Sequence, residues 1–151
     1  ENWNFFPLTL MAILALCDLL LFELKATGEP EVWEEAKTLI HQVYNKAHNS
    51  QEFTMLVNAL LLKARFAVVD GELNQAVKYF NEARTIIKEK NLNELMKKVE
   101  TEQKEFEADF QKWQDLIQKH TSLEERLIQA QLTEYIQEAQ KIVQRSPLKR
   151  P

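Results

Sequence analysis

The stretch "ALLLKARFAVVDGELNQAVKYFNEA", residues 59–83, decides the fold. Small side chains recur within this apolar segment at Ala64, Gly71, Ala76 and Ala83. Two antiparallel helices approach closely only where the side chains at their crossing are small. The stretch therefore predicts two helices that cross at Ala64 and Ala76, with Gly71 making the tight turn between them.

The composition is that of an ordinary globular protein built from long helices. The chain has 151 residues, of which 45% are apolar and 28% charged, and these values fit one domain with a real core. Its two glycines and four prolines predict few turns, because these residues supply most turn geometries. The formal net charge of −4 predicts no nucleic-acid partner, since such binding needs a strongly basic face.

The single cysteine, Cys17, lies in the apolar segment "LALCDLLL". One cysteine excludes an intramolecular disulfide, and its apolar neighbours predict a buried, inert thiol. This usage fits a reducing compartment, so we expect a cytoplasmic protein. The chain begins at Glu1 rather than at a methionine, and on that basis we expect it to be a piece of a longer protein.

The apolar run "FFPLTLMAILALCDLLLFEL", residues 5–24, has about the length of a membrane span. Asp18 lies in its middle, where an acidic side chain costs about 2.5–3.5 kcal/mol on insertion scales. No basic residue precedes the run. A helix that is apolar on all faces also suits the centre of a helical stack. We therefore predict a buried helix and no membrane span.

Apolar residues recur along the chain at intervals of three and four, which is the helical period. Pro30 is placed to begin a helix, and Ser122 with Glu125 forms a capping-box pattern at the start of another. These signals predict an all-α protein without strands, made of about six helices in three antiparallel hairpins. The expected helices cover 7–25, 30–47, 51–69, 73–89, 92–119 and 122–144.

The small-residue spacing of the deciding stretch resembles the tetratricopeptide repeat (TPR), a helix-turn-helix unit of about 34 residues. Ala64, Gly71, Ala76, Phe80 and Ala83 fall on the small, glycine, alanine, aromatic and alanine positions of that motif. The repeat is degenerate elsewhere. Its usual tryptophan, leucine, tyrosine and late proline are replaced by Leu60, Lys63, Ala67 and Lys88.

Residues 10–47 fit the same frame more loosely, with Cys17 at the small position of the first helix. The resemblance implies a short right-handed solenoid with two TPR-like hairpins over 1–90. Residues 91–145 are expected to form a long helical hairpin that caps the stack, and 146–151 a basic tail. The whole also resembles the C-terminal helical-repeat region of large archaeal multidomain proteins.

In a TPR-type stack the first helix of each hairpin lines a concave face, and the resemblance implies a binding groove there. The residues assigned to this groove are Asn58, Leu61, Leu62, Arg65 and Val69, together with Asp18 and Phe22 of the first hairpin. A groove of this apolar character suits a helical or extended peptide of a protein partner. The expected function is therefore a non-enzymatic protein-interaction module.

An alternative is a structural, homo-oligomeric scaffold whose groove is filled by its own C-terminal helix or by a second copy. The expected helix over 92–119 carries a heptad seam of apolar residues with one polar interruption at Gln103. Such a seam is typical of helix pairing. The candidate residues for a dimer seam are Phe106, Phe110, Trp113 and Ile117.

We find no pattern that indicates catalysis, a cofactor or a metal. His41 and His48 are seven residues apart, but no third histidine or cysteine has the spacing that a metal site needs. The acidic residues of 100–109, Glu102 among them, alternate with lysines and are expected on a solvated face. No glycine-rich phosphate loop and no activated nucleophile is present in the sequence.

Two isolated charges within apolar helices, Asp18 and Arg65, occupy equivalent places in the two repeat frames. Equivalent residues on neighbouring first helices lie side by side on the concave face. A charge that is half-buried without a partner is costly, and arginine can bind a carboxylate with two parallel hydrogen bonds. We therefore predict an Asp18–Arg65 ion pair on the groove floor.

Overall fold

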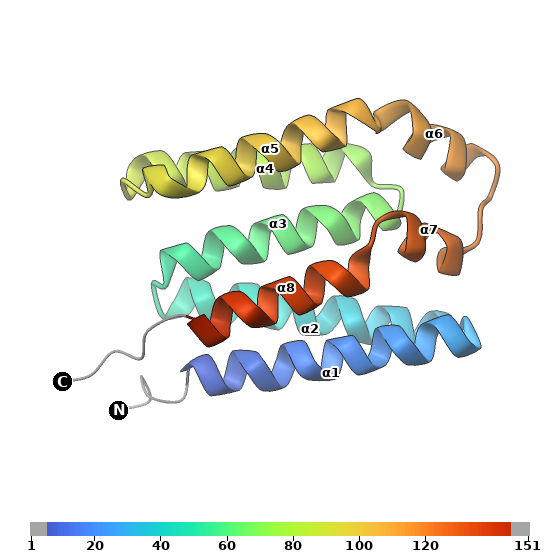
Figure 1. The fold of residues 1–151 in the computed structure, drawn as a ribbon, viewed down its shortest axis with the longest axis horizontal. Helices are drawn as coiled ribbons and strands as arrows, with labels where there is room; N and C mark the ends of the chain where they lie inside the picture. Colours follow the sequence, from blue (N-terminus) through green and yellow to red (C-terminus); the bar gives the residue numbers. More distant parts are fainter. Residues whose placement is uncertain (1–5, 146–151) are drawn as a thin grey trace.

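The computed structural model describes residues 6–145, and the expected basic tail, 146–151, lies outside them. Within the described residues every regular element is helical, which confirms the all-α prediction (Figure 1). The elements are α1 (Phe6–Thr27), α2 (Pro30–Asn49), α3 (Phe53–Val69), α4 (Leu73–Glu89), the short 3₁₀ helix η2 (Asn93–Leu95), α5 (Met96–Ala108), α6 (Phe110–Gln118), α7 (Leu123–Gln129) and α8 (Leu132–Arg145).

The described chain has eight α-helices where about six were expected, because each of the last two expected helices is divided. The first division is at Asp109, where the Phe106 and Phe110 rings pack edge to face at 5.6 Å between centroids. The second follows Ala130 at Gln131, whose φ of 52° is left-handed. Neither division is marked by a glycine or a proline.

The first five α-helices pack on one another in sequence order, and α3 is the central helix (Figure 1). Of its 17 residues 13 are buried, because α2, α4, α7 and α8 surround it. This agrees with its nearly continuous apolar sequence. Its most extensive packing is against α4.

The deciding stretch forms the expected α3–α4 hairpin with Gly71 at its turn. Ala64 and Ala76 are both fully buried within it. Gly71 has a φ of 82°, a conformation that side-chain-bearing residues rarely adopt. A Cβ atom here would also lie 3.2 Å from the Ile117 side chain. The backbone conformation therefore favours a glycine here, and any larger residue would also require the Ile117 side chain of α6 to shift.

The C-terminal segment does not form the expected simple hairpin at the end of the stack. α5 continues the stack against α4, whereas α8 returns to the other end of the chain and packs on α1 and α3. α8 runs in the opposite direction to α1 (Figure 1). Ser122 caps α7 as predicted, since its hydroxyl accepts from the Glu125 backbone N–H at 3.1 Å.

The prediction that the N-terminal helix is buried all round is wrong for one of its faces. The inner face packs on α2 and α8, and Cys17 lies there fully buried, with its pKa raised to about 12 by burial and then by the neighbouring Asp18 charge. The outer face is exposed because α2 and α8, the described helices that pack on α1, cover its other side. Across residues 6–145 we find no helix with both the length and the apolar character of a membrane span.

Candidate functional site

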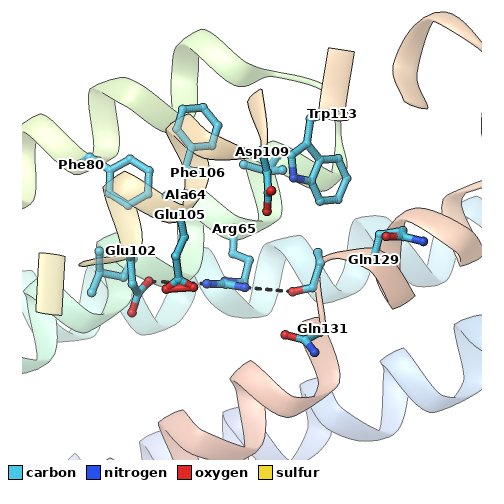
Figure 2. A pocket seen from close by; sticks show the side chains of 13 residues that line it. Ala64, Arg65, Phe80, Glu102, Glu105, Phe106, Asp109, Trp113, Gln129 and Gln131 are labelled. Carbon is cyan, nitrogen blue, oxygen red and sulfur yellow. Dashed lines mark hydrogen bonds and ion pairs between the residues drawn. The ribbon is translucent and has the colours of Figure 1, made fainter. Parts of the chain in front are cut away.

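Charged and polar side chains of α3, α5 and the α7–α8 junction line a cavity of about 110 Å³. Figure 2 shows Arg65 of α3 beside Glu102 and Glu105 of α5, with Gln129 and Gln131 at the α7–α8 junction. We call Arg65, Glu102 and Tyr135, together with the neighbouring Asn58 and Lys98, the polar cluster. Its members come from helices that are far apart in the sequence.

Arg65 is the centre of the polar cluster. One guanidinium nitrogen donates to the backbone carbonyl of Ala130 at 3.0 Å, and the other lies 3.8 Å from Glu102 Oε1 (Figure 2). The guanidinium carbon lies 4.1 Å from the centroid of the Tyr135 ring. A planar cation over an aromatic ring is attracted by the ring's negative face. Arg65 therefore binds the α7–α8 junction and α8 at once.

Glu102 is held almost completely out of water, with a side-chain exposure of 11%. The Tyr135 hydroxyl donates a hydrogen bond to its carboxylate. Burial raises the pKa of Glu102, and the Tyr135 hydrogen bond and the Arg65 charge oppose that rise in pKa without cancelling it. Burial, and then the Glu102 charge, raises the pKa of Tyr135 well above its ordinary value. The carboxylate is thus tied to α8 through a neutral phenol.

Lys98 and Asn58 form the second part of the polar cluster. Lys98 Nζ donates to Asn58 Oδ1 at 2.6 Å, and Asn58 Nδ2 donates to the Thr54 carbonyl at 2.9 Å. Burial lowers the pKa of Lys98, and the nearby Glu102 and Glu138 charges oppose this decrease without cancelling it. A second cavity of about 70 Å³ lies here, between these residues and α8. The buried Asn58 therefore serves as the acceptor that a desolvated lysine needs.

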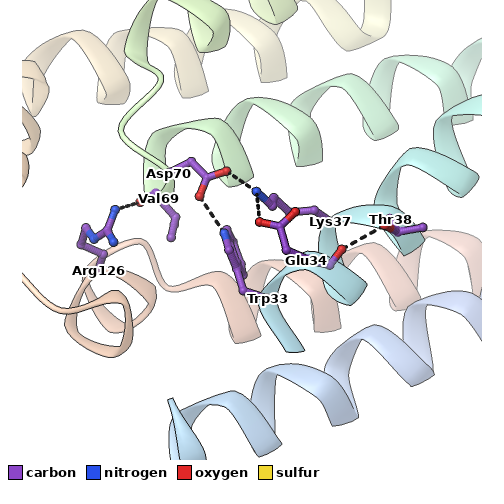
Figure 3. Close-up of polar contacts among 7 residues, drawn as sticks. All are labelled: Trp33, Glu34, Lys37, Thr38, Val69, Asp70 and Arg126. Carbon is purple, nitrogen blue, oxygen red and sulfur yellow. Dashed lines mark hydrogen bonds and ion pairs between the residues drawn. The ribbon is translucent and has the colours of Figure 1, made fainter. Parts of the chain in front are cut away.

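A separate set of contacts fixes the C-terminal end of α3 (Figure 3). The Trp33 indole N–H donates to Asp70 at 2.7 Å and Lys37 Nζ donates to it at 2.8 Å. Arg126 of α7 donates to the carbonyl of Val69. A cation at a helix C-terminus is favourable because the exposed carbonyls there carry negative partial charge. Both α2 and α7 are therefore anchored at the turn that Gly71 makes.

The structure brings most of the predicted groove residues together beneath other helices. Asn58, Leu61, Leu62 and Val69 are buried, and Arg65 is half-buried. Phe22 does not share this location, because it is 76% exposed on the outer face of α1.

The predicted Asp18–Arg65 ion pair is wrong. Arg65 is engaged by Ala130, Glu102 and Tyr135, as described above. The physical reason is the position of α8, which packs on both α1 and α3. The repeat frame predicts instead that α1 and α3 contact each other directly at this place. The register that made Asp18 and Arg65 neighbours is therefore wrong.

The residues predicted as a dimer seam pack within the chain. Phe106 and Trp113 are buried, and Phe110 and Ile117 are half-buried. The Phe106 ring lies 5.6 Å from that of Phe80 between centroids, and Ile117 packs over Gly71. These contacts attach α5 and α6 to the α3–α4 hairpin.

Sequence reasoning missed Glu102 and Lys98 as members of a site. The expectation that Glu102 lies on a solvated face is wrong, since Tyr135 and Arg65 cover it. A signal was present: Glu102 directly precedes Gln103, the polar interruption of the heptad seam. His41 contacts Lys63, with Nδ1 2.9 Å from Nζ, and the described residues contain no cluster of His, Cys, Asp or Glu side chains that could hold a metal.

Comparison with protein-family models, curated proteins and solved structures finds no match to this chain. The polar cluster pairs its charges with groups of its own chain: Arg65 with Glu102, and Lys98 with Asn58. Each of these contacts lies beside α8. These contacts therefore attach α8 to α3 and α5.

Proposed function

We propose that this chain is a non-enzymatic interaction module of TPR-like helical hairpins, in which the concave face is occupied by the chain's own last helix. The observation that carries the proposal is the position of α8 against α1 and α3. The supporting features of the TPR frame are Ala64 and Ala76 at the α3–α4 crossing and the positive φ of Gly71. On this proposal the module is a scaffold element whose groove is filled from within.

The way α8 is bound supports the proposal, because it follows the pattern of an amphipathic helix in a groove. Its buried residues recur at intervals of four, three and four, and they are Leu132, Ile136, Ala139 and Val143. The polar contacts at Tyr135 and at the α7–α8 junction fix the register of the helix. Apolar anchors supply affinity and the buried polar pairs supply specificity.

A second candidate is a module that binds an amphipathic helix of another protein in place of α8. The observation that favours it is incomplete packing: a cavity of about 110 Å³ lies at the α7–α8 junction, and one of about 70 Å³ borders α8 itself. Lys98 and Glu102 are also desolvated there at a cost, with their pKa values shifted toward the neutral forms. A partner helix whose side chains fill these cavities and pair with Lys98 and Glu102 would bind more favourably than α8 does.

Binding of a labelled synthetic peptide with the α8 sequence, Leu132–Arg145, tests the proposal by fluorescence anisotropy. We expect no binding to the native chain, because α8 occupies the groove at very high effective concentration. An Ile136→Glu chain, whose α8 is weakened, is expected to bind the peptide. Gln137→Glu adds the same charge at an exposed position of α8 and is the matched control, which should behave as the native chain does.

The result separates the two candidates. If the native chain binds the peptide as tightly as the Ile136→Glu chain, α8 exchanges freely and the second candidate is correct. If neither chain binds it, while circular dichroism shows both to be folded, the surface beneath α8 is not a helix-binding groove and the proposal is wrong.

A further inference from the structure

The outer face of α1 is the principal exposed apolar surface of the described chain. Five large apolar side chains are exposed in the described part of the chain, and four of them belong to this helix: Leu8 at 65%, Leu16 at 47%, Leu19 at 65% and Phe22 at 76%. The fifth, Ile128 at 50%, lies on α7. Single exposed apolar residues are ordinary, but a contiguous apolar patch marks an interaction site.

The exposed residues of α1 follow the spacing of a helix-pairing seam. We call this set the outer ridge, and its members are Leu8, Ala12, Ala15, Leu19, Phe22 and Ala26, all of them exposed. Their intervals alternate between four and three residues. This is the period at which a helix presents one face to another helix along its length. The apolar side chains and the spacing of the outer ridge therefore suit an apolar helix as partner.

We propose that the outer ridge pairs with the outer ridge of a second copy of the chain, with the two α1 helices antiparallel. A two-fold axis that passes near position 17 places Ala12 opposite Phe22 of the second copy. It also places Ala15 opposite Leu19 and Ala26 opposite Leu8. Every layer then combines one alanine with one large side chain, which is how facing side chains fill an interface evenly. A two-fold axis uses each such layer twice, so the surface complements itself.

Other registers of the same ridge lose this fit. An antiparallel pair shifted by one heptad toward the N-terminus sets Ala12 on Ala15 and Leu8 on Leu19. The opposite shift sets Ala15 on Ala26 and Leu19 on Phe22. A parallel pair sets every residue on its own copy. Each of these arrangements alternates layers that are too wide with layers that are too narrow, and both voids and overpacking are destabilising.

The flanks of the outer ridge add one repulsive and one attractive feature to the pairing. Leu16 lies beside the ridge on one side and meets its own copy across the axis, which widens the apolar contact. Asp18 lies on the other side and also approaches its own copy. Two like charges at this distance repel. Asp18→Asn is therefore expected to tighten self-association, and a partner of another sequence would not give this result.

The outer ridge and α8 use opposite faces of α1. The inner face, with Leu14 and Leu21, is covered by α2 and α8. The pairing therefore does not depend on the function proposed above, and either can fail without the other.

Sedimentation velocity over a range of concentrations tests the pairing. The native chain should be a dimer that dissociates on dilution. Leu19→Ala should raise the dimer dissociation constant about a hundredfold, because the symmetric interface loses a large side chain twice. Ile128→Ala is the matched control, since it removes an exposed apolar side chain elsewhere, and it should leave the constant unchanged.

The antiparallel register is tested by exchanging the large and the small side chain of one layer. In the proposed layer Leu19 faces Ala15 of the second copy, so Ala15→Leu combined with Leu19→Ala keeps one large and one small side chain. The double variant should recover dimerisation to within about threefold of the native chain, whereas either change alone should weaken it. Circular dichroism should show native helix content for all variants, since both positions are exposed.

A native chain that stays monomeric at every concentration overturns the proposal. So does a dimer that Leu19→Ala leaves intact. A double variant that associates no better than Leu19→Ala alone overturns the antiparallel register and with it the argument for a second copy.

Discussion

Replacing Arg65 with methionine should destabilise the protein by detaching α8 from α3. Methionine keeps the unbranched apolar stem of arginine and removes the guanidinium group. The change removes the hydrogen bond to the Ala130 carbonyl at 3.0 Å and the contact with Glu102 at 3.8 Å. It also leaves Glu102, which is 11% exposed, with Tyr135 as its hydrogen-bonding neighbour.

The magnitude follows from the three contacts that are lost. A hydrogen bond from a charged donor contributes about 1.5–3 kcal/mol. The cation–π contact with Tyr135, at 4.1 Å, adds about 1 kcal/mol because Arg65 is partly desolvated. The ion pair adds up to about 1 kcal/mol, since the arginine is 25% exposed. The three contacts share one side chain and do not add fully. We expect a loss of about 3 kcal/mol, or about 6–12 °C in Tm for a chain of this size.

Urea denaturation followed by circular dichroism measures the free energy of unfolding. Arg145→Met is the matched control, because Arg145 is 68% exposed, lies 3.2 Å from a carboxylate, Glu138, that is 55% exposed, and donates to the Lys141 carbonyl at an exposed place. We expect the control to lose about 1 kcal/mol, since a pair with an exposed partner contributes little. Equal losses in the two variants would refute the reasoning, because burial of the partner carboxylate would then make no difference.

Two further predictions concern burial at other points. Burial raises the pKa of Glu102, so the folded state binds its proton more tightly than the unfolded state does. The stability that Glu102 contributes is full below its unfolded pKa of about 4.3 and is lost as pH rises through the folded pKa. Glutamine does not titrate, so Glu102→Gln should remove this loss of stability. In urea melts the free energy of unfolding of the variant, minus that of the native chain, should therefore increase from about pH 4 upward. Parallel pH profiles of the two free energies would contradict the prediction. Ala76→Leu should cost about 1–3 kcal/mol by overpacking the α3–α4 crossing, whereas Ala108→Leu at an exposed position should cost nothing measurable by the same melts, and equal stabilities would exclude the close approach.

Local signals in the sequence were sufficient to place the first four helices. Pro30 begins α2 as predicted, because proline's fixed φ and missing N–H suit the first turn. The turn at Gly71 and the start of α4 at Leu73 also agree. These boundaries depend on backbone geometry that one or two residues impose, and such information is present in a single sequence.

The placement of α8 could not be predicted in this way. The spacing of Leu132, Ile136 and Ala139 shows that one face of the helix is buried, but any apolar surface of the right width satisfies that pattern. The burial of Glu102 depends on Tyr135 and Arg65, each more than thirty positions away. A charged residue's local sequence favours solvent, and only the tertiary arrangement reverses that preference.

The contact of α8 with α1 closes the stack on itself, and this changes how it should unfold. In an open array of helices each hairpin touches only its neighbours, so the terminal helices fray and exchange their amide hydrogens first. Here the first and last helices of the described chain protect each other. Amide protection in α1 should therefore rise and fall together with that in α8, and these two helices should open as one cooperative unit.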